Sequence, residues 1–412
     1  MIDNLMVYLD SITRLEAIHH DLTHSELAHC NISLERITAA ISDARSKVEA
    51  SFRSWLTEAK LQCTGGSVAE SGSNESIPES TQTPETLDTI AQALQIIVNF
   101  SLNSPAHFSA LIADWIEIRS NYLAGSCETL FVQAQSFEKA DGKWIEGSHP
   151  LPRAFQHARS LLQAEELFMS KVWPTTAIGP TFLRSAQIVR DLAVSTVEGI
   201  TGKMKKALSR REYVDQVYLF NVLGHSYTSV HLGDDSSSLA VQVLVPSLKF
   251  FVTTTATLLT DLIGEIRGTI PRAIERPFTI PQNATVYELT SLTVNVLKRI
   301  EKDSHVIDAI LVGQSSNNWD GTLNTLADTS ISANLAHVQH YFADILGSLE
   351  SSIDAKSKTL RRPMQTLLFQ LNNYNYLAKG VRAINNELVD AAVVGKRYEQ
   401  IIEALKRSFI NR

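Results

Sequence analysis

The sequence predicts an all-α protein, an elongated rod of stacked antiparallel helical hairpins and bundles. Apolar residues recur at steps of three and four from Leu5 to about Phe409, which is the period of a helix face. Alternation with a period of two, which marks a half-buried strand, is hard to find. Successive antiparallel hairpins that bury their apolar stripes against one another stack into an elongated array.

The first two helices are expected to form a hairpin. The stripe of the first comprises Leu5, Leu9, Ile12, Leu15, Ile18 and Leu22. The stripe of the second comprises Leu34, Ile37, Ile41, Ala44, Val48, Phe52 and Trp55. Ser33 is the expected N-cap of the second helix. Sustained steps of three and four are also typical of a short coiled-coil seam.

A break follows the hairpin. Residues 64–86 are rich in Ser, Glu, Thr, Gly and Pro with almost no apolar content, so they are predicted to be a disordered linker. Thr83, Pro84 and Glu85 then suit the N-cap and first turn of a third helix, because the acid matches the helix dipole.

The third helix carries Leu87, Ile90, Leu94 and Ile97, and a long fourth helix follows, in which Trp115 and Phe131 are expected core residues. Further helices are expected near residues 151–173, 180–209, 213–230, 237–268, 285–303, 330–359, 362–382 and 390–409. The proline-interrupted segment 271–284 is expected to be extended, and 313–329 to be a loop. The predicted domains are 1–63, a hairpin; 87–270, the middle bundles; and 271–412, a C-terminal bundle.

Composition limits the function classes. The chain has 412 residues, is 44% apolar and carries a formal net charge of -7, which argues against a nucleic-acid binder. Three cysteines without paired spacing indicate reduced thiols in a cytosolic protein, and the N-terminus lacks the pattern of a signal peptide. Residues 239–260 have the length of a membrane span, but their threonines and Pro246 favour a central buried helix.

No motif for catalysis, a cofactor or a metal is present. His20 and His24 are spaced to share a metal, yet no Cys or carboxylate pattern completes the site, and a solvated helix face is favoured. Phosphate loops, zinc-protease signatures and nucleophile elbows are absent from the sequence. The chain is therefore predicted not to be an enzyme and to act through its surface.

Two basic runs are candidate contacts for anionic lipid or for partners. The first comprises Lys203, Lys205, Lys206, Arg210 and Arg211. The second comprises Lys356, Lys358, Arg361 and Arg362. Cations near a charged leaflet attract it at about 1 kcal/mol each. The alternative, which is favoured for either run alone, is a favourable charge at a helix C-terminus.

Three stretches carry residue patterns that suit structural roles. In 115–123, Arg119 beside Tyr122 suggests a polar anchor inside a helical junction. In 285–291, Thr285 and Glu288 have the spacing of a capping box. In 368–377, Asn372 and Asn373 are poor choices for exposed helix positions, but buried amides between helices satisfy backbone groups. The aromatic Tyr376 follows this pair.

In their order and spacing, these stretches together resemble the seventy-kilodalton subunit of the exocyst, the complex that tethers secretory vesicles to the plasma membrane. The resemblance covers most of the chain and suggests a shortened, fungal-like or divergent member. It implies a cullin-repeat-like rod, no enzymatic activity and no cofactor. It also implies a scaffold role in exocytosis and protein transport. Other exocyst subunits, a Rho-type small GTPase and phosphoinositide membranes are the implied partners.

The chain departs from the family at both ends. Because it stops about thirty-five residues after the stretch 368–377, most of the family's last domain, with its main lipid-binding residues, is expected to be missing, and the N-terminal coiled coil is expected to be shortened. The implied location is cytoplasmic and peripheral at sites of exocytosis on the plasma membrane. A divergent helical scaffold or decoy that has lost membrane binding is the alternative.

Overall fold

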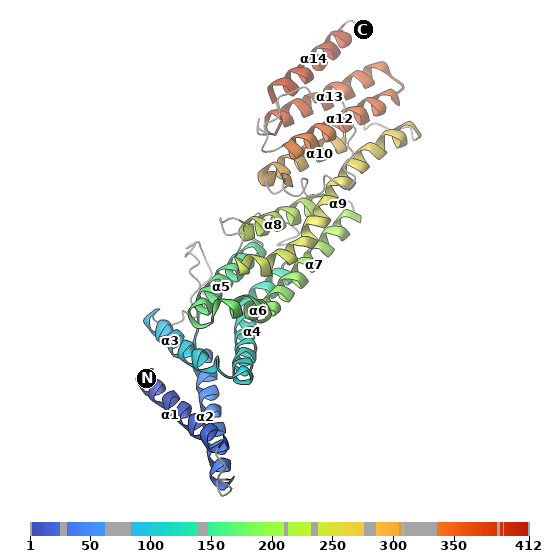
Figure 1. Ribbon diagram of the computed structural model, residues 1–412. Helices are drawn as coiled ribbons and strands as arrows, with labels where there is room; N and C mark the ends of the chain where they lie inside the picture. Colours follow the sequence, from blue (N-terminus) through green and yellow to red (C-terminus); the bar gives the residue numbers. More distant parts are fainter. Residues whose placement is uncertain are drawn as a thin grey trace. The chain divides into compact units, whose positions relative to one another are not determined.

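The computed structural model describes residues 2–24, 31–61, 84–138, 147–209, 213–231, 238–275, 286–304, 307–308, 336–384, 388–389 and 391–410. Within these ranges every regular element is a helix and none is a strand (Figure 1). The predicted all-α class is therefore confirmed. The linker predicted at 64–86, apart from its last three residues, and the loop predicted at 313–329 lie outside the described residues.

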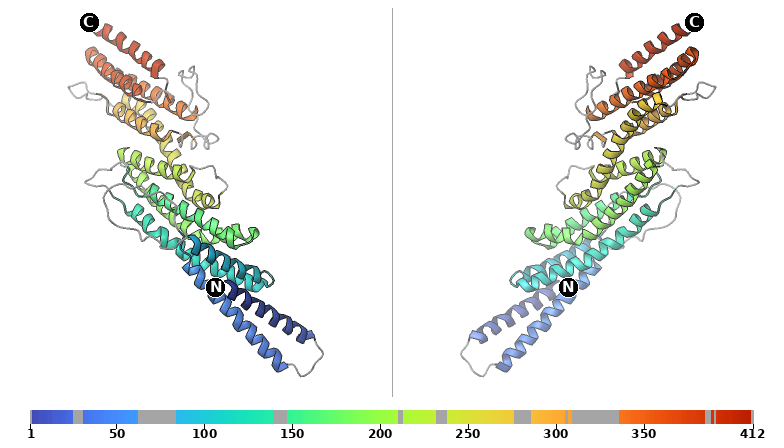
Figure 2. Two further views of the ribbon diagram at one scale, coloured as in Figure 1. Left: turned by 90° about the vertical axis from the view of Figure 1, so that its left-hand side faces the viewer. Right: turned by 90° about the vertical axis from the view of Figure 1, so that its right-hand side faces the viewer.

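The described helices follow the chain in the order in which Figure 1 labels them. They are α1 (Ile2–His24), α2 (Asn31–Glu58), α3 (Pro84–Ser101), α4 (Pro105–Ser136), α5 (Leu151–Val172), α6 (Thr175–Ser185), α7 (Gln187–Ser209), α8 (Tyr213–His231), α9 (Leu239–Glu275), α10 (Glu288–Ile300), the 3-10 turn η1 (Glu301–Asp303), α12 (Ala336–Lys358), α13 (Pro363–Arg382) and α14 (Ala391–Ile410). Figure 2 shows α1 and α2 running antiparallel, as predicted for the hairpin.

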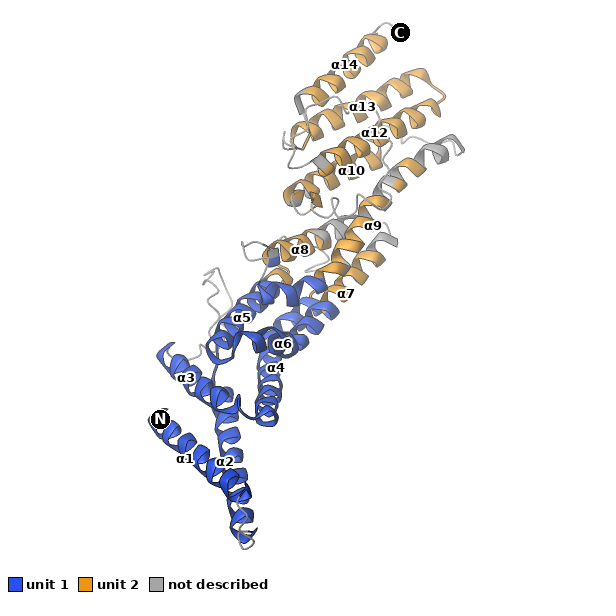
Figure 3. Ribbon diagram, in the orientation of Figure 1, with its two compact units in different colours: residues 1–136, 153–195, 230–247 blue, residues 137–152, 196–229, 248–412 orange. Residues whose placement is uncertain are grey.

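The chain divides into two compact units, coloured in Figure 3. Unit 1 comprises residues 1–136, 153–195 and 230–247, and unit 2 comprises 137–152, 196–229 and 248–412. The α1–α2 hairpin contacts α3 and α4 within unit 1. The domain boundaries predicted from composition stay predictions.

Three local predictions about helix ends were wrong. Ser33 lies inside α2, which begins at Asn31, so it is not the N-cap. The helix predicted over 180–209 is two helices, because α6 begins at Thr175 after Pro174 and the chain turns at Ala186 before α7. Residues 271–275 of the segment predicted to be extended lie within α9, because a proline removes only one backbone donor and need not end a long helix, and residues 276–284 lie outside the described residues.

The core of unit 1 is built around α4. Its buried residues recur at every fourth position from His107 to Phe131. Four residues turn a helix through 400°, so this stripe winds around α4 and meets α2, α3 and α6 on different sides. Trp115 is fully buried, stacks on Phe168 at 5.6 Å between ring centroids and meets Trp173 edge-on at 5.5 Å. The predicted burial of Trp115 and Phe131 is confirmed.

The core of the C-terminal part of unit 2 is built around α13. This helix contacts α10, α12 and α14. Gly380 lets α13 approach α10 closely, because a Cβ atom built on Gly380 would lie 2.5 Å from Cγ1 of Val294. Phe369, Asn373 and Leu377 form a buried stripe on α13 at steps of four residues.

One described stretch, Leu239–Thr257 of α9, is long and apolar enough to cross a membrane. The protein itself buries 59% of this stretch. Thr254 and Thr255 are buried within it, and such polar residues are less suited to lipid than to a protein core. The burial agrees with the central helix predicted from the sequence.

Candidate functional site

The first family-like stretch forms a buried ion pair. Arg119 of α4 is 1% exposed, and its Nε atom lies 3.1 Å from both carboxylate oxygens of Glu165 of α5. Its Nη2 atom donates to Oε2 of the same carboxylate at 2.5 Å. Planar guanidinium and carboxylate groups suit such paired hydrogen bonds, which fix geometry as well as contributing energy. The pair therefore sets how α4 packs on α5.

The same stretch holds the end of α2. Arg119 Nη1 donates to the carbonyl oxygen of Ala59 at 2.6 Å, and its guanidinium lies 4.3 Å from the ring centroid of Tyr122. The Tyr122 hydroxyl donates to the carbonyl oxygen of Leu61 at 3.1 Å and accepts from its N–H at 3.0 Å. A helix C-terminus leaves carbonyls unsatisfied and favours a cation, so α4 supplies what the end of α2 lacks.

The third stretch supplies a cap from one helix to another. Asn373 of α13 is fully buried, and its Oδ1 atom accepts from the backbone N–H of Tyr287 at 2.9 Å and from the Thr290 hydroxyl at 2.7 Å. Its Nδ2 atom donates to the carbonyl oxygen of Phe369 at 2.8 Å. Asn373 thus satisfies donors at the start of α10 although it lies 83 to 86 residues away in sequence.

This arrangement corrects the predicted capping box. Glu288 is the first residue of α10, whereas a capping box needs it at the third helical position. Thr285 lies outside the described residues. Asn372 and Tyr376 are half-buried on α13. The sequence analysis named Asn372 and Asn373 together as buried amides that satisfy backbone groups, and Asn373 takes this role. Its place four residues after Phe369 and four before Leu377 on the apolar stripe was the signal that distinguishes it from Asn372.

A second polar cluster was missed by sequence reasoning. Glu350 of α12 is buried and accepts from the Tyr398 hydroxyl at 2.8 Å and from Arg397 Nη2 at 2.5 Å, both on α14. Burial raises the pKa of Glu350, and the nearby guanidinium opposes that rise. The position of this acid between the apolar residues Leu346 and Ile353 was the signal for this contact.

The first basic run lies at the end of α7. Lys203, Lys205 and Lys206 are exposed there, and Arg210 and Arg211 lie outside the described residues. Lys203 Nζ donates to the carbonyl oxygen of Phe137 at 3.4 Å. Burial, with a smaller contribution from the Lys203 charge, lowers the pKa of His149 to about 4.

The second basic run spans the last turn of α12 and the loop before α13. Lys358, Arg361 and Arg362 are exposed, whereas Lys356 is half-buried with its ammonium 6.0 Å from the Tyr287 ring centroid. Burial lowers the pKa of Lys356. The three exposed cations lie close together in the chain, between the end of α12 and the start of α13.

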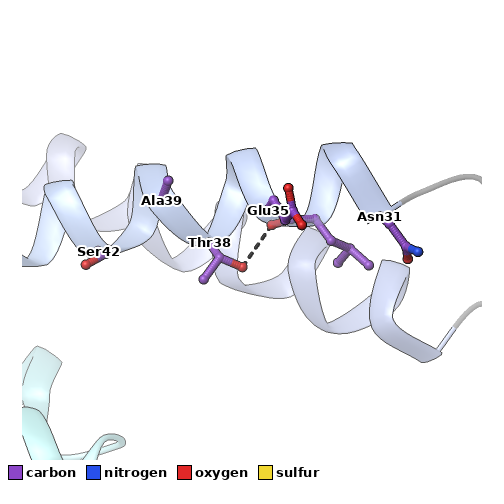
Figure 4. Close-up of a pocket in the computed structure, with 6 residues that line it drawn as sticks. Asn31, Glu35, Thr38, Ala39 and Ser42 are labelled. Carbon is purple, nitrogen blue, oxygen red and sulfur yellow. Dashed lines mark hydrogen bonds between the residues drawn. The ribbon is translucent and has the colours of Figure 1, made fainter.

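Two of the described histidines of the hairpin lie side by side. The rings of His20 and His24 stack at 4.2 Å, and His29 lies outside the described residues. No group of three His, Cys, Asp or Glu side chains suited to a metal is found in the described part of the chain. A hollow on α2 is open to solvent and lined by that helix alone, at Asn31, Leu34, Glu35, Thr38, Ala39 and Ser42 (Figure 4).

The chain matches a known protein family over more than half of its length. The family model for the C-terminal region of the Exo70 exocyst complex protein matches residues 153–412. Exocyst complex component 7 of Homo sapiens is 22% identical over 261 residues, which cover 61% of this chain and 34% of that protein. The Drosophila melanogaster component 7 is 26% identical over 257 residues, covering 60% and 37%. The match thus spans about a third of the length of these curated relatives.

Solved structures show the same fold. A structure of S. cerevisiae Exo70 superposes with a TM-score of 0.67 at 14% identity, covering 100% of this chain and 76% of that chain. A second S. cerevisiae Exo70 structure gives a TM-score of 0.61 at 15% identity, covering 99% and 78%.

Proposed function

We propose that this chain, which belongs to the Exo70 family of exocyst subunits, works as a non-enzymatic subunit of the exocyst vesicle-tethering complex in exocytosis. The match of the family model over more than half of the chain is the observation that carries this proposal. The name of the human and fly relatives, exocyst complex component, supports it. The partners would be other exocyst subunits, and the location would be cytoplasmic at sites of exocytosis on the plasma membrane.

The polar residues of the family-like stretches support action through the surface. Arg119 and Asn373 are buried, and their hydrogen bonds join helices of the same chain. Residues used in this way stabilise packing and are not available to a ligand. Partner binding is therefore assigned to exposed helix faces rather than to a pocket.

Co-purification tests the proposal. The wild-type chain and a full-length Exo70 relative are each expressed with the remaining exocyst subunits, and the composition of the purified complex is measured. We expect the chain to enter the complex in a fixed ratio. Loss of the chain during purification, while the full-length relative is retained, would contradict the proposal.

Membrane binding is a further proposal, favoured by the exposure of Lys203, Lys205 and Lys206 at the end of α7. We expect sedimentation with phosphoinositide liposomes that weakens as salt rises, because the attraction is screened. Changing the three lysines to Gln should abolish it. The comparison variant changes Lys358, Arg361 and Arg362 to Gln, which removes the same charge from the second run, and we expect it to keep most of the binding. Equal loss in both variants would show that net charge, rather than the end of α7, decides binding.

The alternative of a divergent scaffold or decoy predicts a different result. Wild-type chain that stays in the supernatant at physiological salt would favour a scaffold that has lost its lipid contact. A Rho-type GTPase is the other proposed partner, and binding should depend on the loaded nucleotide. Equal retention of the GTP-loaded and GDP-loaded forms would contradict a switch-dependent contact.

A further inference from the structure

The end of α1 carries two histidines on one face. His20 and His24 are four residues apart, which makes them neighbours on the surface of a helix, and α1 ends at His24. Both side chains are exposed. Their rings stack with centroids 4.2 Å apart and planes inclined by 27°. The structure therefore brings together two rings that the sequence only spaced for a shared metal.

A contact with the helix backbone fixes which nitrogen of His24 is free. Its Nδ1 atom lies 2.8 Å from the carbonyl oxygen of His20. A carbonyl oxygen only accepts hydrogen bonds, so Nδ1 carries the proton and donates it. In the neutral ring the lone pair is then on Nε2, the nitrogen farther from the main chain. Histidines that bind metals commonly hold their other nitrogen in this way.

A carboxylate lies beside the ring of His20. Nδ1 of His20 lies 3.8 Å from Oδ1 of Asp21. This separation is longer than a hydrogen bond, but both side chains are exposed, and exposed side chains change rotamer within picoseconds to nanoseconds. A carboxylate next to Nδ1 favours the tautomer that is protonated there, which leaves Nε2 of His20 as a second free lone pair.

The charge of this part of α1 suits a bound cation. Residues 15–24 contain two acids, Glu16 and Asp21, and no Lys or Arg. Arg45 of α2 pairs with Glu16 at 2.7 Å, which neutralises both of those charges one turn before His20. The C-terminal end of a helix also carries the partial negative charge of the helix dipole. The two imidazoles therefore lie where the electrostatic potential attracts a metal ion.

We propose that His20 and His24 together chelate one divalent transition metal ion, such as Zn²⁺, through their Nε2 atoms. Imidazole ligands suit Zn²⁺, Cu²⁺ and Ni²⁺, whereas Mg²⁺ and Ca²⁺ prefer oxygen ligands. In the described part of the chain no third His, Cys, Asp or Glu joins them in a group suited to a metal. The remaining positions around a tetrahedral ion are then open to water. This proposal does not depend on the exocyst assignment.

Two protein ligands give a moderate affinity. A closed structural zinc site has about four ligands, so a pair supplies about half of its binding free energy, and we expect a dissociation constant between about 1 and 200 µM. Because both ligands lie on one helix, the metal also ties the last turns of α1 together. The amides of those turns should therefore open less often once the metal is bound.

Calorimetric titration of the whole chain with Zn²⁺ tests the site, with Mg²⁺ as the control metal. The matched control variant is His19→Gln, because His19 lies on the same helix but its Nε2 atom is 2.9 Å from Oγ1 of Thr38. We expect His20→Gln and His24→Gln each to bind one Zn²⁺ fewer than the wild-type chain in this affinity range. His19→Gln should bind as the wild-type chain does, and Mg²⁺ should not occupy the site.

Hydrogen exchange locates the ion. Zn²⁺ should protect the amides of residues 20–24 in the wild-type chain and in His19→Gln, but not in His20→Gln or His24→Gln. Circular dichroism checks that all of these chains keep the same helix content, which is expected because the substitutions lie at the surface of α1.

Four results would overturn the proposal. They are equal zinc binding by all of the chains, loss of the same ion in His19→Gln, protection that is absent from residues 20–24, and saturation only above about 1 mM. A loss of half an ion per chain in His20→Gln would also overturn it, because two chains would then share each metal.

Discussion

Replacing Asn373 by Leu should destabilise the C-terminal helices through lost hydrogen bonds rather than lost volume. Leu has nearly the same shape, but it leaves the Tyr287 N–H and the Thr290 hydroxyl without their acceptor at the start of α10. A buried donor left unsatisfied costs about 1–3 kcal/mol. The Thr290 hydroxyl can rotate toward a carbonyl one turn earlier, so we expect a total of about 2–4 kcal/mol.

Urea unfolding followed by circular dichroism measures the cost, and hydrogen exchange shows whether the amides of α10 open first. Asn375→Leu is the matched control, because it makes the same change at an exposed position of the same helix. It should change stability by less than about 0.5 kcal/mol. If Asn373→Leu unfolds at the wild-type urea concentration with α10 equally protected, the cap does not stabilise the fold as argued.

Other substitutions test the remaining contacts and one titrating group. Arg119→Met leaves the Glu165 carboxylate buried and unpaired and should cost about 3–5 kcal/mol, most of it recovered when Glu165 is also made Leu; equal loss in the double variant would contradict this. Gly380→Ala should cost about 1–3 kcal/mol from overpacking against Val294, and adding Val294→Ala should reduce the loss in thermal unfolding. Trp115→Ala should cost about 3–5 kcal/mol in urea, and an unchanged midpoint would show that this side chain is not a core anchor. His149, with its pKa lowered to about 4, binds its proton more readily when unfolded, so wild-type stability should fall as pH drops from about 6.5 toward 4, and His149→Gln should flatten that part of the curve.

The period of the apolar residues was enough to predict most helices. The expected ranges 151–173, 213–230 and 362–382 differ from α5, α8 and α13 by one residue at most at either end. Capping residues were less reliable, since Ser33 lies inside α2 and the start of α10 is satisfied by another helix. A cap depends on which group reaches the backbone, and that group can come from far along the chain.

The sequence likewise identified some residues of the polar contacts but not their partners. Arg119 drew notice because it stands near Tyr122, and Asn373 because an Asn pair suits an exposed helix position poorly, but no sequence pattern named Glu165 or Thr290 as their partners. Glu350 was overlooked although it lies between apolar residues of α12, because an acid within a helix is usually solvated. Polar residues within apolar stripes are the positions to examine first in such a chain.

Helix content and apolar faces are local properties, since each follows from residues within a few turns of one another, and the sequence by itself determined them here. Which faces are buried is a property of the assembled helices, because among the described helices α3 and α4 contact the hairpin and the hairpin extends beyond them (Figure 2). The stripe on α1 is continuous in the sequence, yet Ile12 is buried and Ile18 is 48% exposed. Only the tertiary structure decided that difference, because burial depends on how far the neighbouring helices reach.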